Sequence, residues 1–174
     1  MKTLRLGSIG PSVQLLQLAL VRAGYAPLAT DGIFGAATQY ALRRFQQNNA
    51  LTPDGVAGAL THRALLPWYT GFLVHTVSPG DTLSFVAARY GTTVNAVLMA
   101  NPDMDAQNLA PGSALVVPLP FDVVPTTIDW CSALVGYCVR GLSARYPFIV
   151  SGEIGKSVMN RPLWCMTLGR GDNR

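Results

Sequence analysis

An aspartate opens each of two copies of the motif D-G-x-x-G-x-x-T, at residues 31–38 and 54–61. Several oxygen ligands gathered in one short loop would be the chemistry of a calcium site. Each copy supplies a single carboxylate, so we reject calcium binding. We expect Asp31 and Asp54 instead to accept hydrogen bonds from backbone amides in a turn, with the following glycine in a conformation that other residues avoid.

Three cysteines are the other candidates for metal binding or redox chemistry: Cys131, Cys138 and Cys165. Their odd number argues against a complete set of internal disulfides. If Cys131 and Cys138 share a helix, their spacing along the sequence separates them by roughly 10 Å, which is too far for a disulfide. We therefore predict that they are small buried hydrophobic residues and not ligands.

The composition limits the partners of the chain. Thirteen Lys and Arg against nine Asp and Glu give a net charge of +4, which suits an anionic polymer such as a cell wall and is also ordinary for a small domain. No basic run with interleaved aromatic residues is present, which argues against nucleic acid. No apolar run reaches the roughly 20 residues that span a bilayer. Residues 1–12 lack the apolar stretch of a signal peptide, so we expect none.

Residues 3–66 are predicted to form helices that the motif copies introduce. The first helix begins at Pro11 and Ser12 and ends at Gly24. Its inward stripe comprises Val13, Leu16, Leu20 and Ala23. A second helix follows the first copy, with Thr38, Ala41, Leu42 and Phe45 inward and Arg43, Arg44, Gln46 and Gln47 outward. A short third helix follows the second copy and uses Leu60, Ala64 and Leu65.

This first segment resembles the peptidoglycan-binding domain that is built as a three-helix bundle. The resemblance rests on G-x-x-V-x-x-L-Q at residues 10–17, on D-G-x-F-G-x-x-T-x-x-A-x-x-x-F-Q at residues 31–46 and on the second motif copy. It implies a domain over residues 1–68 that binds peptidoglycan.

Residues 74–120 follow a short aromatic linker at 67–73 and have a different pattern. An alternating strand at 74–77 leads into a turn at 79–81, where Asp81 or Thr82 could cap a helix. That helix carries Leu83, Val86, Ala87 and Tyr90. Gly91 ends it, and Thr92 or Thr93 caps a second helix with Val94, Val97 and Leu98, which Asn101-Pro102 ends. A strand at 115–117 closes the segment.

This strand, helix, helix, strand order resembles the LysM module, a small binder of N-acetylglucosamine polymers. The resemblance rests on P-G-D-T-L at 79–83, N-P-D at 101–103 and L-x-P-G at 109–112. It implies a shallow glycan-binding groove lined by Gly80, Asp81, Thr82 and Leu83 on one side and by Asn101, Pro102, Asp103, Met104 and Leu109 on the other. Hydrogen-bonding groups beside an apolar wall suit acetamido sugars. A purely structural role for Asp81 and Asn101 as helix caps remains an equal alternative.

Residues 121–174 are predicted to form one helix and a β-hairpin. Thr127 is expected to cap a helix that runs to about Arg145, with Leu134, Val135, Cys138 and Leu142 on its inner face. Strands at 148–154 and 162–168 follow Pro147 and are joined by a hairpin turn. An isolated hairpin has little stability of its own, so this segment is expected to pack on the LysM module, to pair with a second chain or to be poorly ordered.

The last segment resembles the beginning of zinc carboxypeptidase-like metallopeptidases, through Y-P at 146–147, I-G-x-S at 154–157 and R-P-L at 161–163. Asn160 stands where that family usually has glycine, and asparagine also tolerates a left-handed turn. Catalysis in the family needs zinc held by H-x-x-E and a distant histidine. His62 and His75 are the two histidines of the sequence, and neither begins H-x-x-E. We therefore expect no catalytic residue, no zinc site and no cofactor in this chain.

Together these segments predict an α+β multidomain chain: a three-helix bundle at 1–68, a βααβ module at 74–120 and, at 121–174, a helix and β-hairpin from an incomplete α/β peptidase domain. The combination resembles γ-D-glutamyl-L-diamino acid endopeptidases, zinc enzymes that cut peptidoglycan stem peptides. The resemblance implies the wall-anchoring region of such an enzyme, with zinc only in a longer parent protein. The alternative is a stand-alone peptidoglycan-binding protein. The expected location is the cell wall or spore, with the cytoplasm as the alternative.

Overall fold

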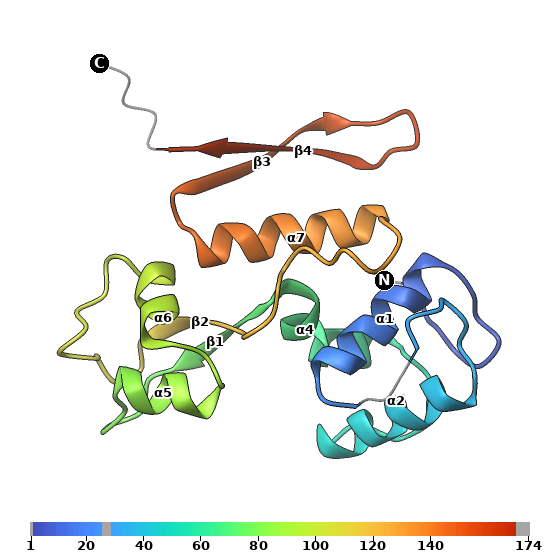
Figure 1. Ribbon diagram of the computed structural model, residues 1–174, viewed down its shortest axis with the longest axis horizontal. Helices are drawn as coiled ribbons and strands as arrows, with labels where there is room; N and C mark the ends of the chain where they lie inside the picture. Colours follow the sequence, from blue (N-terminus) through green and yellow to red (C-terminus); the bar gives the residue numbers. More distant parts are fainter. Residues whose placement is uncertain (1, 26–28, 170–174) are drawn as a thin grey trace. The chain divides into compact units, whose positions relative to one another are not determined.

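A computed structural model describes residues 2–25 and 29–169 of the chain. The chain divides into two compact units, residues 1–69 with 124–135 and residues 70–123 with 136–174. Mixed helices and antiparallel strands make up the elements, in agreement with the predicted α+β class (Figure 1). In the described residues no helix has both the length and the apolar character that crossing a bilayer requires.

The first unit contains helices α1 (Pro11–Arg22), α2 (Ala36–Asn48) and α3 (Ala59–Ala64), as the sequence predicts, and helix α4 (Leu66–Thr70). Isolated bridges join Leu4 to Ala57 and Ile9 to Ile33, so the segment before α1 lies along both motif copies. The largest fully buried side chains of this core are Leu15, Leu16, Leu20, Phe34, Leu42, Phe45, Leu65 and Tyr69.

Three details of the first unit differ from the sequence prediction. Gln46 is buried and not outward, because its amide finds partners inside the fold. Leu60 is 69% exposed, and Thr61 takes the inward position in α3. The linker predicted at 67–73 is wrong, since α4 occupies most of it. Pro67 lies in the first turn of α4, where its missing N–H costs no hydrogen bond.

The LysM-like segment has the predicted βααβ order. Its elements are β1 (Phe72–Thr76), α5 (Leu83–Arg89), α6 (Val94–Ala100) and β2 (Ala114–Pro118), and β1 pairs antiparallel with β2 from Phe72↔Pro118 to Thr76↔Ala114. The hydroxyls of Thr82 and Thr93 cap α5 and α6 by accepting the amides of Phe85 and Ala96. The core of this segment comprises Val77, Leu83, Val86, Ala87, Val97, Leu115 and Val117.

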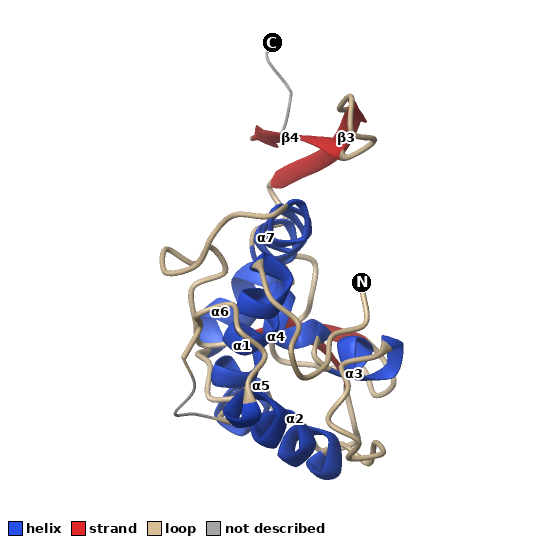
Figure 2. Cartoon of the chain, turned by 90° about the vertical axis from the view of Figure 1, so that its right-hand side faces the viewer, coloured by secondary structure: helices blue, strands red, loops and turns tan. Residues whose placement is uncertain are grey.

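The terminal segment forms helix α7 (Ser132–Arg145) and an antiparallel hairpin of β3 (Ile149–Lys156) and β4 (Pro162–Leu168). The helix start predicted at Thr127 is wrong: helical geometry begins only at Ser132, after bends that follow Pro125. Asn160 adopts a φ of 56° in the hairpin turn, the left-handed conformation expected of it. The hairpin lies beyond α7 with its strands largely exposed (Figure 2).

The end of α7 is attached to the LysM-like segment by one guanidinium group. Arg145 donates hydrogen bonds to the carbonyl oxygens of Gly71, Leu119 and Phe121, which flank β1 and β2. Gly141, one turn earlier, lies so close to the carbonyl oxygen of Thr70 that a side chain would not fit. These contacts lie within the second unit, so the helix packs on the LysM-like segment as the sequence analysis expected.

Candidate functional site

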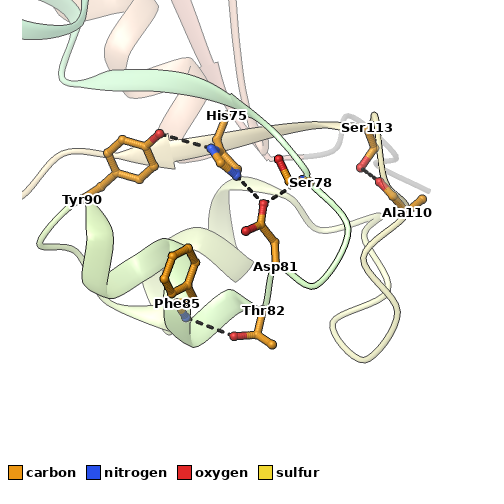
Figure 3. Close-up of polar contacts among 8 residues, drawn as sticks. All are labelled: His75, Ser78, Asp81, Thr82, Phe85, Tyr90, Ala110 and Ser113. Atoms are coloured by element: carbon orange, nitrogen blue, oxygen red, sulfur yellow. Dashed lines mark hydrogen bonds and ion pairs between the residues drawn. The ribbon is translucent and has the colours of Figure 1, made fainter.

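The turn between β1 and α5 forms one side of the expected glycan groove. Gly80 adopts a φ of 88° and Ser78 donates its backbone N–H to Oδ2 of Asp81 over 2.7 Å. The same oxygen lies 2.9 Å from Nε2 of His75 in strand β1 (Figure 3). The hydrogen bond from Ser78 first, and the one from His75 second, lower the pKa of Asp81. Asp81 therefore remains ionised and holds the turn closed.

His75 connects this turn to helix α5. Its Nδ1 lies 3.2 Å from the hydroxyl of Tyr90, while Nε2 faces Asp81. The His75 and Asp81 side chains are only 7% and 9% exposed. A substrate therefore has little access to the hydrogen-bonded groups of Asp81, His75 and Tyr90. The network therefore stabilises the turn between β1 and α5.

Asn101 opens the other side of the expected groove and ties helix α6 to strand β2. Its Nδ2 donates to the carbonyl oxygens of Val97 and Val116, each over 2.7 Å. Its Oδ1 accepts the backbone N–H of Val116 over 2.9 Å. Because these bonds engage both ends of the amide, Asn101 fixes where the next loop starts rather than offering that amide to a ligand.

The loop after Asn101 borders a hollow of about 610 Å³. Four of the expected groove residues meet in its wall: Asn101, Pro102, Asp103 and Met104. The wall also contains Asp105, Asn108 and Pro147, the last from the corner between α7 and β3. Gly80, Asp81, Thr82, Leu83 and Leu109 are not among its lining residues.

The remaining groove residues differ in how they could meet a ligand. Gly80, Thr82, Pro102 and Asp103 are exposed, whereas Leu83 is buried in the apolar cluster. Met104 and Leu109 pack against that same cluster from the opposite loop. Residues from both sides of the expected groove therefore pack in or against the same apolar cluster. A direct role in glycan binding for any of the nine residues stays a prediction.

Two glutamines explain why the D-G-x-x-G-x-x-T motif occurs twice. Gln17 in α1 donates from Nε2 to Asp31 Oδ1, to the Ile33 carbonyl and to the Thr38 hydroxyl, over 2.9, 3.1 and 3.1 Å. Its Oε1 accepts the N–H of Gly32 over 2.9 Å. The first Asp, the first Gly and the Thr of the motif thus all surround one amide.

Gln46 in α2 repeats this arrangement with the second copy. It donates to Asp54 Oδ1, the Val56 carbonyl and the Thr61 hydroxyl over 2.9, 3.0 and 3.2 Å, and accepts the N–H of Gly55 over 2.9 Å. Neither glutamine was predicted to bind the motif. The available signal was a Gln directly after a buried apolar residue of the preceding helix, as in Leu16-Gln17 and Phe45-Gln46.

The carboxylates of Asp31 and Asp54 accept hydrogen bonds from within the domain. A backbone N–H, from Ile33 or Val56, lowers the pKa of Asp31 or Asp54 most, and the glutamine amide lowers it further. Each aspartate therefore serves the turn that precedes a helix, as the sequence analysis predicted.

Among residues 2–25 and 29–169, no group of three or more His, Cys, Asp and Glu side chains is placed to hold a metal ion. His62 is buried, with Nδ1 3.0 Å from the Tyr69 hydroxyl and Nε2 3.1 Å from the carbonyl oxygen of Lys2. Burial lowers the pKa of His62.

All three cysteines are free: Cys138 is buried, as predicted, whereas Cys131 is half-buried and Cys165 is exposed, so the prediction of burial is wrong for Cys165. The described residues therefore do not fit a zinc ion.

Comparison with protein families identifies two domains in the chain. A peptidoglycan binding domain matches residues 9–65, and a LysM domain matches residues 75–118. These are the two domains that the motifs predicted, and together they support a cell-wall binding region. Both matches end before the terminal helix and hairpin.

Two enzymes are similar in sequence to a short part of this chain. A zinc D-Ala-D-Ala carboxypeptidase of Streptomyces albus G is 48% identical over 63 residues, 34% of this chain and 24% of the relative. A spore cortex-lytic enzyme of Bacillus cereus is 42% identical over 60 residues, 34% of this chain and 23% of the relative. The chain thus spans about a quarter of the length of these relatives.

Solved structures resemble only part of the chain. The N-terminal domain of SleB is 38% identical and aligns with a TM-score of 0.37, covering 37% of this chain and 89% of that one.

Proposed function

We propose that this chain anchors a protein on peptidoglycan by binding the polymer through two domains at once. The observation that carries the proposal is the presence of two different wall-binding domain types in one chain. The two matched segments are separated only by residues 66–74. Because so few residues join the two domains, binding by one raises the local concentration of the other on a repeating polymer, so two weak sites retain the protein without any reaction.

The LysM domain is the proposed glycan-binding part. Exposed Gly80, Thr82, Pro102 and Asp103 supply backbone, hydroxyl and carboxylate groups for the sugar hydroxyls and amides. Met104 and Leu109 provide an apolar wall for the acetamido methyl group. Asp81 and Asn101 act indirectly, since their hydrogen bonds shape the two loops.

The parent protein is proposed to be a zinc metallopeptidase that resembles γ-D-glutamyl-L-diamino acid endopeptidases. The support is the resemblance of residues 146–163 to the start of that peptidase domain, together with a zinc D-Ala-D-Ala carboxypeptidase that is 48% identical over 63 residues. Zinc would be bound by residues outside this chain, so no catalytic step is assigned to it. Location at the cell wall or spore follows from the same relatives and is equally a proposal.

A stand-alone binder is the second candidate function. The observation that favours it is that both matched segments are binding domains and that neither match extends into residues 119–174. Reading the coding region downstream of Arg174 separates the two: an H-x-x-E motif within the next strands supports the peptidase, and an immediate stop codon supports the binder.

Self-association through the hairpin is proposed with a second copy of this chain as the partner. Strand β4 carries no charged residue from Pro162 to Leu168 and has one partner strand, so its other edge is free among the described residues. Strand β3 instead contains Glu153 and Lys156 and a bulge, features that discourage pairing at an edge. Light scattering of the purified chain tests this: a monomer at all concentrations argues against it.

Co-sedimentation with purified peptidoglycan tests the main proposal. The wild-type chain should pellet with the polymer, and Asp103→Ala should pellet less because an exposed groove carboxylate is lost. Asp129→Ala is the matched control, since it removes the same charge from an exposed position outside the groove. A wild-type chain that stays in the supernatant refutes wall binding, and equal loss in both variants refutes the groove.

A further inference from the structure

Two hollows of the second unit adjoin one another and extend from one side of the expected LysM groove. The hollow beside the loop after α6 has a volume of about 610 Å³, and a second one has about 460 Å³. They share Pro102, Asp103 and Pro147 in their walls. The surface depression therefore continues from the LysM loop to the corner where α7 turns into β3.

The far end of this depression is apolar and aromatic. Met99, Phe148 and Val150 line the second hollow. Phe148 is 50% exposed, and its ring lies 5.7 Å from that of Tyr146, which packs against it. An aromatic ring supported by a neighbour and half open to solvent offers a flat apolar surface, on which the apolar face of a sugar ring can lie.

The near end of the depression is polar. Asp103 makes no side-chain hydrogen bond within the described part of the chain, and it borders both hollows. Asp105 and Asn108 lie in the wall of the first one. Carboxylate oxygens accept hydrogen bonds from sugar hydroxyls and amides, and an asparagine amide can both donate and accept. A polar edge beside an aromatic platform is the lining that a carbohydrate requires.

We propose that a strand of N-acetylhexosamine units bound at the LysM loop continues past Pro147 and places a further sugar on Phe148 and Val150. This subsite lies in the terminal segment, outside the LysM domain, and the inference rests on the glycan binding proposed above. The occupant is the sugar strand, because Pro102 and Asp103 join this hollow to the LysM loop and because Met99, Phe148 and Val150 give the rest of its wall an apolar surface.

Binding of N-acetylglucosamine oligomers to the full chain tests the subsite, with a trimer and a hexamer as probes in titration calorimetry. Only the longer oligomer can fill the LysM groove and the extra subsite together. Phe148→Ala should weaken hexamer binding about eightfold, the loss expected for about 50 Å² of apolar contact, and should leave trimer binding unchanged. Phe148→Tyr should restore hexamer binding because it keeps the ring.

Two further variants guard against a folding defect. Ile154→Ala removes an exposed apolar side chain from the same strand but outside both hollows, and should bind both oligomers like wild type. Val150→Ser changes a side chain that is 63% exposed, so it should fold normally and weaken only hexamer binding, by about threefold for roughly 25 Å² of lost contact.

The outcomes separate the subsite from the function on which it rests. Unchanged hexamer affinity in Phe148→Ala and Val150→Ser, with intact trimer binding, overturns the subsite alone. A wild-type chain that binds peptidoglycan but does not prefer the hexamer also overturns it alone. A wild-type chain that binds neither oligomer nor peptidoglycan overturns both proposals.

Discussion

Replacing Gln46 by alanine is expected to destabilise the first domain far more than the same change at Gln47, its neighbour in α2. Gln46 is 1% exposed and its amide makes four hydrogen bonds to the second motif copy, whereas Gln47 is exposed. The sequence pattern treats these two glutamines alike. The comparison therefore isolates the contribution of the buried amide.

The magnitude follows from which partners lose their hydrogen bonds inside the protein. Asp54 is exposed, so water replaces the lost amide there. The buried N–H of Gly55 loses its acceptor, and the buried hydroxyl of Thr61 loses its donor and keeps only a hydrogen bond of 3.5 Å to the Val56 carbonyl oxygen. Each buried polar group without a partner costs about 1–3 kcal/mol, so the variant should lose about 3 kcal/mol. For a domain of this size, that loss lowers the melting temperature by about 12–24 °C.

Differential scanning calorimetry of the full chain measures this shift. Hydrogen exchange of peptides from residues 51–65 assigns the transition to the first domain. Gln47→Ala should stay within about 0.5 kcal/mol of wild type, as surface substitutions usually do. If both variants melt together, or if the amide of Gly55 keeps its protection in Gln46→Ala, the reasoning about the buried amide is refuted.

Three further predictions concern other parts of the chain. Because burial lowers the pKa of His62 from 6.5, the unfolded chain binds more protons, so the first domain should lose stability as pH falls below about 6.5. Melting curves at falling pH should show this slope in wild type and a weaker one in His62→Gln; equal slopes contradict the assignment. Gly141→Ala should destabilise the second unit by about 1–3 kcal/mol or more, because the added Cβ would overlap the Thr70 carbonyl oxygen. Gly136→Ala is the control, since a Cβ added there would lie 3.9 Å from the Trp164 side chain, an ordinary contact distance. Chemical denaturation should rank the two alanine variants in that order, and the reverse order refutes the packing argument. If β4 pairs with a second copy, antiparallel pairing centred on Cys165 brings the two exposed Cys165 thiols together. Mild oxidation should then give a disulfide-linked dimer, and Cys165→Ser should abolish it. Protein that stays monomeric on a non-reducing gel counts against the pairing.

The sequence predicted the order of elements well because the signals were local. Thr82 and Thr93 cap helices, Asn160 takes a left-handed turn, and β4 has the predicted bounds. Each depends on a few neighbouring residues. The start of α7 was missed because Thr127 is a good capping residue by type, whereas the helix begins at Ser132, directly after Cys131, which is not a typical cap.

The burial of Gln46 could not be predicted from periodicity. A hydrophobic pattern counts glutamine as polar and places it outward, yet a polar group is stable inside when every bond is satisfied. The candidate site shows a related difficulty. Asp81 and Asn101 have the types that bind sugars, but the structure uses them to hold loops, and only three-dimensional contacts reveal this. Phe148 had no motif to mark it.

The sequence distance spanned by each set of contacts bears on the order of folding. The Gln46 bonds join residues separated by only 8 to 15 positions, and those of Gln17 by 14 to 21. Strand β1 instead pairs with residues between 38 (Thr76 to Ala114) and 46 (Phe72 to Pro118) positions away. Because short loops close at a lower entropic cost, the helical domain should form while the ribosome is still synthesising β2. The nascent chain would then emerge with one wall-binding domain already folded.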